Sequence, residues 1–199
     1  MFGGIVAAVG TVREVKPERG GARVVIDTGR LGLGDVAVGD SIAVNGICLT
    51  VTARKARTFL AHVSRATLAC TAGFSAGDRV NLEKAMRVSD RVGGHLMAGH
   101  VDGVGTVRRT KAAGDNRMLA VAVPKALAKY VARKGSIAVN GVSLTVNEVD
   151  GAAFEVNLIP HTLAATNLGA LRRGDKVNVE VDLLARYVER LEKRQNERT

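Results

Sequence analysis

The chain has 199 residues, of which 46% are hydrophobic and 24% are charged, a balance typical of a globular protein with one large domain or two small ones. The longest uncharged apolar stretch, near Gly3–Val12, is too short to cross a bilayer, and no basic residues precede it as they would in a secretory signal. The net charge of +10 is spread without a block of five like charges, and only 3% of residues are aromatic, which argues against membrane and nucleic-acid binding. Two cysteines cannot form a disulfide framework, and neither has partners at zinc-ligand spacing, so we expect a cytoplasmic protein without a metal.

Short Val-rich runs separated by Gly, Asp and Asn fill the first half of the chain. They predict β-strands at residues 4–15, 22–28, 41–54, 58–63 and 79–85. Within the third run, Asn45-Gly46 lies between alternating apolar residues and predicts a tight hairpin, because both residue types tolerate φ > 0. Five or six short strands with 23 glycines in the chain favour a small antiparallel barrel.

The second half of the chain repeats the first. SIAVNGICLTVT at 41–52 recurs as SIAVNGVSLTVN at 136–147, with 9 of 12 positions identical at an offset of 95. The same offset relates VGTV at 9–12 to VGTV at 104–107, and GDRVNLE at 77–83 matches GDKVNVE at 174–180 after the second copy gains two residues. The chain is therefore a tandem duplication, and we expect an all-β protein with one barrel over residues 1–90 and a second over residues 91–182.

Helix signals occur at two places. Pro124 and Gly135 bracket a segment that predicts a short helix, since Pro favours the first turn and Gly follows the last. Over residues 183–199 a second helix is predicted with Asp182 as its N-cap and one apolar stripe formed by Leu184, Tyr187, Val188 and Leu191. That stripe must be buried against the chain's own barrels or against another subunit, and we favour a subunit contact.

Small polar side chains occupy equivalent positions in the two copies. Cys48 precedes Thr50 by two residues, and Ser143 precedes Thr145 in the same way, so each pair shares one face of a strand. This pattern is typical either of a half-buried strand with small residues or of two related ligand pockets. We expect His100 to lie on the strand that opens the second copy, in glycine-rich sequence that would admit a ligand. His95 and His100 are five residues apart, a spacing that does not suit a metal site.

Taken together, MFGG, NGICLTVT, GGHLMAGHVDGVG, NGVSLTVN, LIPHTLAATNLG and GDKVNVEVDLLARYVERL resemble the riboflavin synthase family over essentially the whole chain. The resemblance implies dismutation of two 6,7-dimethyl-8-ribityllumazine molecules, by transfer of a four-carbon unit, into riboflavin and 5-amino-6-(D-ribitylamino)uracil, without an external cofactor. It further implies two six-stranded antiparallel Greek-key barrels and a homotrimer held partly by the C-terminal helix. The active site would lie where the first barrel of one subunit meets the second barrel of its neighbour.

The resemblance also carries residues over by motif. The candidates for proton transfer, nucleophilic addition and other catalytic duties are Ser41, Cys48, His100, Ser143 and Asp182. The first pocket would comprise Gly4, Ile5, Val6, Leu49, Thr50, His62, Val63, Ser64, Arg65, Ala66 and Thr67 around Cys48, closed by Gly99, His100 and Val101. Phe2 falls at a position that also contributes to substrate binding in the family. The second would comprise Lys134, Leu144, Thr145, Asn157, Leu158, Ile159, Pro160, His161 and Thr162 around Ser143.

Two other functions remain open at this point. Antenna or carrier proteins of this fold bind lumazine or flavin without converting it, and the first copy has SRATLACTAGF where the second keeps TLAATNLG. A basic barrel that binds nucleic acid is the third reading, which the low aromatic content disfavours. Association with lumazine synthase is also left open by the sequence.

Overall fold

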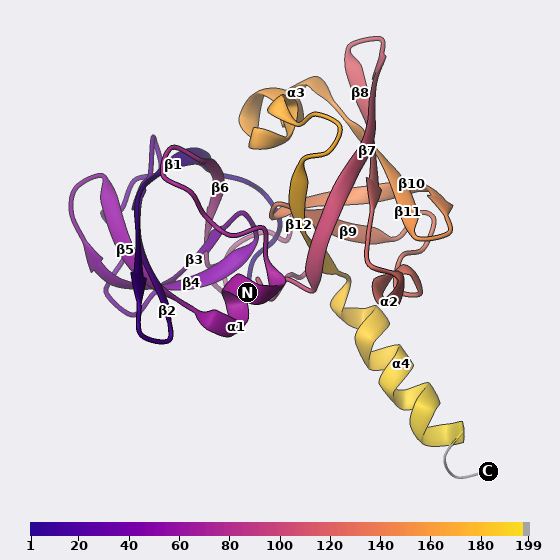
Figure 1. Cartoon of the computed structure of the whole chain (residues 1–199), viewed down its shortest axis with the longest axis horizontal. Coiled ribbons are helices and arrows are strands. Elements are labelled where there is room, and N and C mark those ends of the chain that lie inside the picture. The colour runs from indigo at the N-terminus through magenta and orange to yellow at the C-terminus, as the bar shows by residue number, and fades with distance from the viewer. Residues whose placement is uncertain (197–199) are drawn as a thin grey trace.

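The computed structural model describes residues 1–196 and folds them mainly into β-strands (Figure 1). The first copy contains β1 (Ala8–Glu18), β2 (Gly21–Asp27), β3 (Ser41–Val44), β4 (Ile47–Arg54), β5 (Thr58–Ser64), α1 (Arg65–Cys70) and β6 (Arg79–Lys84). The second contains β7 (Gly103–Ala113), β8 (Asn116–Ala122), α2 (Lys125–Ala128), β9 (Ser136–Val139), β10 (Val142–Asp150), β11 (Ala153–Leu158), α3 (Pro160–Ala165), the 3-10 helix η1 (Asn167–Ala170) and β12 (Lys176–Val181). Helix α4 (Leu183–Asn196) follows the second copy.

Each copy closes into a six-stranded antiparallel barrel with the same strand order. The first barrel runs β1-β2-β5-β4-β3-β6, and the second runs β7-β8-β11-β10-β9-β12. Closure leaves no strand edge exposed to another chain. The predicted all-β duplication of two barrels is confirmed, as is the C-terminal helix up to residue 196. The predicted end of that helix, at residues 197–199, lies outside the described residues.

Apolar side chains fill both barrels. Alternate residues of each strand point inward, so that Ile26 and Phe59 lie in one core and Val121 and Phe154 lie in the other, all fully buried or nearly so. Because the interiors are packed, a ligand has to bind on the outer faces of the strands or between the barrels.

The two predicted hairpin turns meet where the barrels touch. Asn45 and Gly46 both have positive φ, as do Asn140 and Gly141, which is the geometry of the tight turn that the Asn-Gly pairs predict. Gly46 and Gly141 pack backbone to backbone, and a Cβ at Gly46 would lie 2.8 Å from the Gly141 nitrogen. A side chain at Gly46 or Gly141 would therefore push the barrels apart.

Asparagine side chains join the barrels by reciprocal hydrogen bonds. The Asn81 amide nitrogen donates to the Asn140 carbonyl at 2.9 Å, and that of Asn178 donates to the Asn45 carbonyl at 2.9 Å. Asn167 adds a bond from its side-chain nitrogen to Asn45 Oδ1 at 2.9 Å. These buried and half-buried amides satisfy one another across the junction and hold the two barrels in a single arrangement.

One member of this network has no counterpart in the first copy. Ala72 occupies the position equivalent to Asn167, and its backbone N–H donates to Asn178 Oδ1 just as that of Asn167 donates to Asn81 Oδ1, both at 2.7 Å. A cavity of about 300 Å³ lies beside Ala72 and Asn140. We expect Ala72→Asn to complete the network and to raise the free energy of unfolding by about 1 kcal/mol, or roughly 2–4 °C in Tm. Thermal unfolding of this variant, compared with that of the Ala72→Ser control, measures the change in Tm. An unchanged or lower Tm would contradict the prediction.

The helices differ in part from their prediction. The segment from Pro124 is helical only to Ala128, so the expected helix up to Gly135 is wrong beyond that residue. Single turns replace it there, with Tyr130 and Val131 packing on the second core and Lys134 adopting φ +66°, which no helix accommodates. No helix in the part of the chain up to residue 196 has the length and apolar character needed to cross a membrane.

Helix α4 leaves the second barrel and projects beyond both barrels (Figure 1). Asp182 Oδ1 accepts a hydrogen bond from Leu184 N at 3.0 Å, so the predicted N-cap is confirmed. The apolar stripe is open to solvent in the single chain, with Leu184 72% and Leu191 62% exposed. The chain's own barrels therefore do not cover the stripe.

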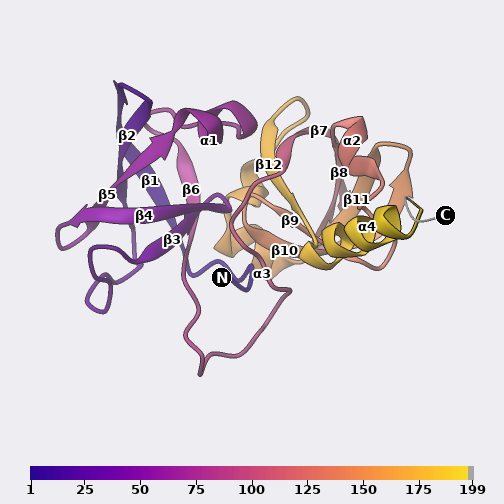
Figure 2. The ribbon, with the colours of Figure 1, turned by 90° about the horizontal axis from the view of Figure 1, so that it is seen from below.

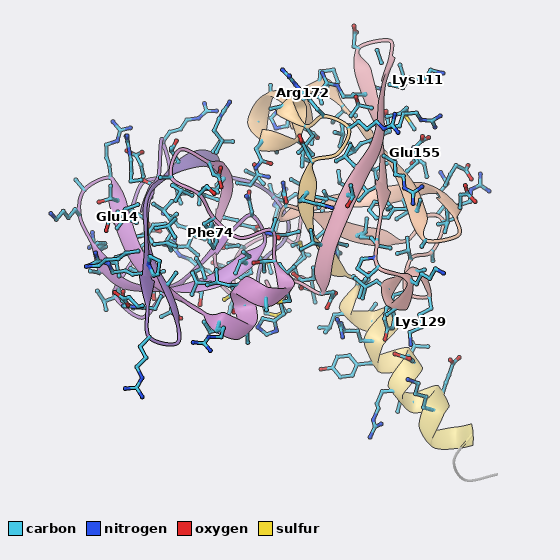
Figure 3. The ribbon with its side chains drawn as sticks, viewed as in Figure 1. Glu14, Phe74, Lys111, Lys129, Glu155 and Arg172 are labelled. Atoms are coloured by element: carbon cyan, nitrogen blue, oxygen red, sulfur yellow. The ribbon has the colours of Figure 1, made fainter. Side chains whose placement is uncertain are left out.

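The opposite side of α4 is tied to the second barrel by polar contacts. Glu189 accepts hydrogen bonds from Lys129 and Tyr130, and Figure 3 shows Lys129 beside the helix. These bonds, with Lys193, lower the pKa of Glu189 to about 2. Arg186 pairs with Asp102, whose side chain is almost completely buried. Polar contacts thus set the direction of the helix and leave its apolar face outward.

Candidate active site

Two short segments cross between the barrels and pair with each other. Phe2 and Met97 exchange backbone hydrogen bonds of 2.9 and 3.0 Å, which forms an isolated antiparallel bridge. Both side chains are buried in a small core between the barrels together with Ala43 and Ala138. The N-terminus consequently lies at the barrel junction, as Figure 2 shows.

Each crossing segment ends against a strand that bears a candidate nucleophile. The Gly99 carbonyl accepts a hydrogen bond from Cys48 N at 2.8 Å on β4 of the first barrel. The Gly4 carbonyl accepts one from Ser143 N at 2.9 Å on β10 of the second barrel. Both glycines have positive φ, and a Cβ on either would lie 2.5–2.7 Å from the Cβ of the facing Cys48 or Ser143. The two contacts are equivalent, one for each copy.

The first candidate site forms on the outer face of β4. Cys48 is half-buried and Thr50 is exposed, so the predicted shared face is confirmed, and Ser41 lies opposite Thr50 on β3. His100 lies in an exposed extended segment before β7 rather than on a strand, which corrects its predicted placement. Val101 packs on the first core.

The segment of residues 62–67 joins β5 to α1 in the first barrel. Ser64 caps α1 by accepting from Thr67 N at 3.1 Å, and its hydroxyl lies 2.9 Å from that of Thr67. His62 lies 3.1 Å from a carboxylate oxygen of Glu18, while Arg65 and Ala66 are exposed. The start of α1 thus offers exposed polar groups next to the end of β5.

The second candidate site forms on the outer face of β10. Ser143 is half-buried and Thr145 is exposed, as are Lys134, Ile159, Pro160 and His161. Asn157 and Thr162 are half-buried, and α3 begins at Pro160. Val6 packs on the second core. The prediction that Gly4 and Val6 belong to the first pocket is therefore wrong, because both lie against the second barrel. Ile5, between them, lines a hollow together with Leu31 and Ser41 of the first barrel.

The structure reveals one candidate that the sequence did not assign to either pocket. His95 Nδ1 lies 2.7 Å from the Ser143 Oγ, and the His95 backbone N–H donates to the same oxygen at 3.3 Å. The other ring nitrogen is buried and has no hydrogen-bond partner among residues 1–196. Burial lowers the pKa of His95 below 6.5, partly offset by the charge of Asp182. The imidazole is therefore neutral at pH 7 and can take up a proton.

Some predicted site residues point away from both outer faces. Leu49, Val63 and Leu158 are buried in the barrel cores, so only their backbones are available to a ligand. Phe2 is buried in the junction, which gives it a packing role. Leu144 is half-buried against the second core.

A model of the lumazine binding domain matches the chain twice, over residues 3–85 and 98–182. The riboflavin synthase of Photobacterium phosphoreum is 45% identical over 193 residues, which covers 96% of this chain and 88% of that one. The chain belongs to the riboflavin synthase family. The Mycobacterium bovis and Bacillus subtilis riboflavin synthases are 41% and 37% identical and cover 96% and 99% of this chain, and 98% and 92% of those chains.

Solved structures agree with the family assignment. The structure of LumP complexed with riboflavin superposes with a TM-score of 0.84 at 28% identity, covering 91% of this chain and 99% of LumP. LumP complexed with 6,7-dimethyl-8-(1'-D-ribityl) lumazine gives a TM-score of 0.82 at 27% identity, with the same coverage. The duplicated family fold thus also occurs in a protein crystallised with a lumazine and with a flavin.

Proposed function

We propose that the chain is a riboflavin synthase, a transferase that dismutates two 6,7-dimethyl-8-ribityllumazine molecules into riboflavin and 5-amino-6-(D-ribitylamino)uracil. The observation that carries this proposal is the pair of equivalent outer-face sites, each built from one strand and one crossing segment. Two copies of one site suit a reaction between two copies of one substrate. The full-length similarity to riboflavin synthases supports the same reaction.

The chemistry assigns roles to groups at the two sites. One lumazine must lose a proton from its 7-methyl group, and the other must accept a nucleophile at the adjacent ring carbon. Ser143 and Cys48 are the nucleophile candidates, and His95 can accept the Ser143 hydroxyl proton across their 2.7 Å contact. His100 is a second proton acceptor on the segment facing Cys48, and the hydroxyls of Thr50 and Thr145 orient the two rings.

Oligomerisation completes the arrangement that we propose. The exposed α4 stripe supports a homotrimer in which α4 packs against neighbouring copies, since an apolar helical face needs a partner. The first site of one subunit would then face the second site of its neighbour, so that the two bound lumazines meet. We also propose a cytoplasmic location, which the two free cysteines support because thiols stay reduced there.

The deciding experiment follows the visible spectrum of 6,7-dimethyl-8-ribityllumazine mixed with ligand-free protein. Catalytic appearance of riboflavin, with two lumazines consumed for each flavin, is the expected result. Tight binding without conversion over hours would instead make the protein a carrier or antenna. That outcome would overturn the enzymatic proposal and keep the binding sites.

The burial of His95 predicts a pH dependence that can be measured without turnover. Its pKa is lowered in the folded chain, so the unfolded chain takes up a proton first as pH falls. The stability contributed by the neutral imidazole is full above pH 6.5 and is lost as pH falls through the folded-state pKa. We expect an NMR titration to place the His95 midpoint below 6.5, with assignment from His95→Gln. A midpoint above 6.5 would contradict the lowered pKa of this half-buried imidazole.

A further inference from the structure

Two buried glutamates lie at equivalent positions where the barrels meet. Glu83 on β6 is 8% exposed and Glu180 on β12 is 6% exposed. Neither has a cationic partner among its hydrogen bonds, and burial raises the pKa of both. Burying a carboxylate lowers the stability of the fold unless the carboxylate is well hydrogen-bonded. The hydrogen bonds of these two glutamates are therefore needed for the fold.

Both carboxylates bind backbone N–H groups of the crossing segments. Glu83 accepts from Gly3 N at 2.7 Å and from Gly4 N at 3.1 Å, one bond at each oxygen. Glu180 accepts from Ala98 N at 2.7 Å and Gly99 N at 3.1 Å in the same pattern. We call each carboxylate with its two N–H donors a clamp: Glu83 with Gly3 and Gly4, and Glu180 with Ala98 and Gly99. The two clamps have matching geometry, one for each copy.

Each clamp belongs to one barrel but holds a glycine that contacts the candidate site of the other barrel. Glu83 belongs to the first barrel, but the Gly4 that it holds contacts Ser143 on the second barrel. Glu180 belongs to the second barrel, but the Gly99 that it holds contacts Cys48 on the first. In each case the N–H that the glutamate binds and the carbonyl that contacts the strand belong to the same glycine. The glutamate therefore directly restricts the position of the residue that contacts the site.

We propose that Glu83 and Glu180 are positioning residues that each shape the site of the opposite barrel, Glu83 acting on the Ser143 site and Glu180 on the Cys48 site. Neither residue is assigned contact with substrate. An effect of these glutamates on catalysis rests on the proposed function. Their effect on the structure of the opposite barrel's site does not. Each site would then depend on both barrels, which gives a reason for keeping both copies in one chain.

Glutamine is the informative substitution because it keeps the shape of glutamate. A carboxylate presents an acceptor to both N–H groups, whereas an amide presents one oxygen and one NH2 group. The NH2 group would face a backbone N–H, so one donor loses its partner and the glycine segment is released from its strand. Glu180→Gln should therefore loosen Gly99 from Cys48, and Glu83→Gln should loosen Gly4 from Ser143.

Thiol alkylation reports each site separately and requires no substrate. In a Cys70→Ser background, Cys48 is the remaining thiol, and its reaction with iodoacetamide reports the first site. The triple variant Cys48→Ser, Cys70→Ser, Ser143→Cys moves the probe to the second site. We expect Glu180→Gln to raise alkylation at Cys48 by about tenfold and Glu83→Gln to change it less than about twofold. At the second-site thiol the two effects should be reversed.

The two glutamine variants act as matched controls for each other. General loosening of the fold would raise alkylation at both sites in both variants and would overturn the proposal, as would an effect confined to the variant's own barrel. Should either glutamine variant fail to fold, Glu83→Asp and Glu180→Asp provide a milder pair, because aspartate keeps the charge but is too short to reach both N–H groups. Lumazine turnover is then measured separately on the Cys70→Ser background. If each glutamine variant changes alkylation at the opposite barrel's site but the parent protein does not convert lumazine, the proposed enzymatic function is rejected. The positioning role of the two glutamates is then still supported.

Discussion

Replacing His95 by glutamine is expected to lower kcat for riboflavin formation by about 10²–10³-fold, the range that general acid–base catalysis contributes. The physical reason is the 2.7 Å contact between His95 Nδ1 and Ser143 Oγ, since glutamine can occupy a similar position but cannot accept a proton near pH 7. KM should change much less, because the hydroxyl and the Gly4 contact remain. Single-turnover kinetics with 6,7-dimethyl-8-ribityllumazine separates the chemical step from binding.

A double-mutant cycle tests whether His95 and Ser143 act as a unit. Ser143→Ala should produce a similar fall in kcat, and the double variant should be little slower than either single variant. Fully additive effects would assign the two residues to separate steps. Residual turnover is expected in all three variants, because alignment of two bound substrates can contribute roughly 7–11 kcal/mol.

Placing charge on the apolar stripe of α4 is expected to abolish subunit association. Leu184 and Leu191 are exposed in the single chain, and burial in a subunit contact would contribute about 1.5–3 kcal/mol for each side chain. Leu184→Glu with Leu191→Glu would remove that gain and bury carboxylates without partners, which weakens association by at least about a thousandfold. Analytical ultracentrifugation at micromolar concentration measures the oligomer, and lumazine turnover should fall with it.

The matched control changes charge on α4 outside the stripe. Arg190→Glu alters net charge without touching Leu184, Tyr187, Val188 or Leu191, and it should leave both the oligomer and turnover intact. Full activity in a monomeric Leu184→Glu, Leu191→Glu variant would show that one chain holds a complete active site. That result would reject the proposed inter-subunit site.

Local features of this protein were accessible from the sequence. The repeat revealed the duplication, and the Asn-Gly turns at 45–46 and 140–141 identified both hairpins because their conformation depends on the turn residues themselves. Strand alternation placed Cys48 and Thr50 on one face of a strand for the same reason, and the structure shows that this is the outer face. The motif GGHLMAGH contained His95, but its partner Ser143 is 48 residues away, and no local pattern signals that contact.

Only the tertiary structure decided how the copies share their sites. Gly4 precedes the first barrel in the chain but lies against the second, and Glu83 and Glu180 resemble ordinary strand-end charges until their bonds across 79–82 residues are seen. Turn type and strand face follow from neighbouring residues, whose geometry the covalent chain restricts. The crossing of the segments depends instead on how two packed barrels fit together, which is set by the sum of many long-range contacts.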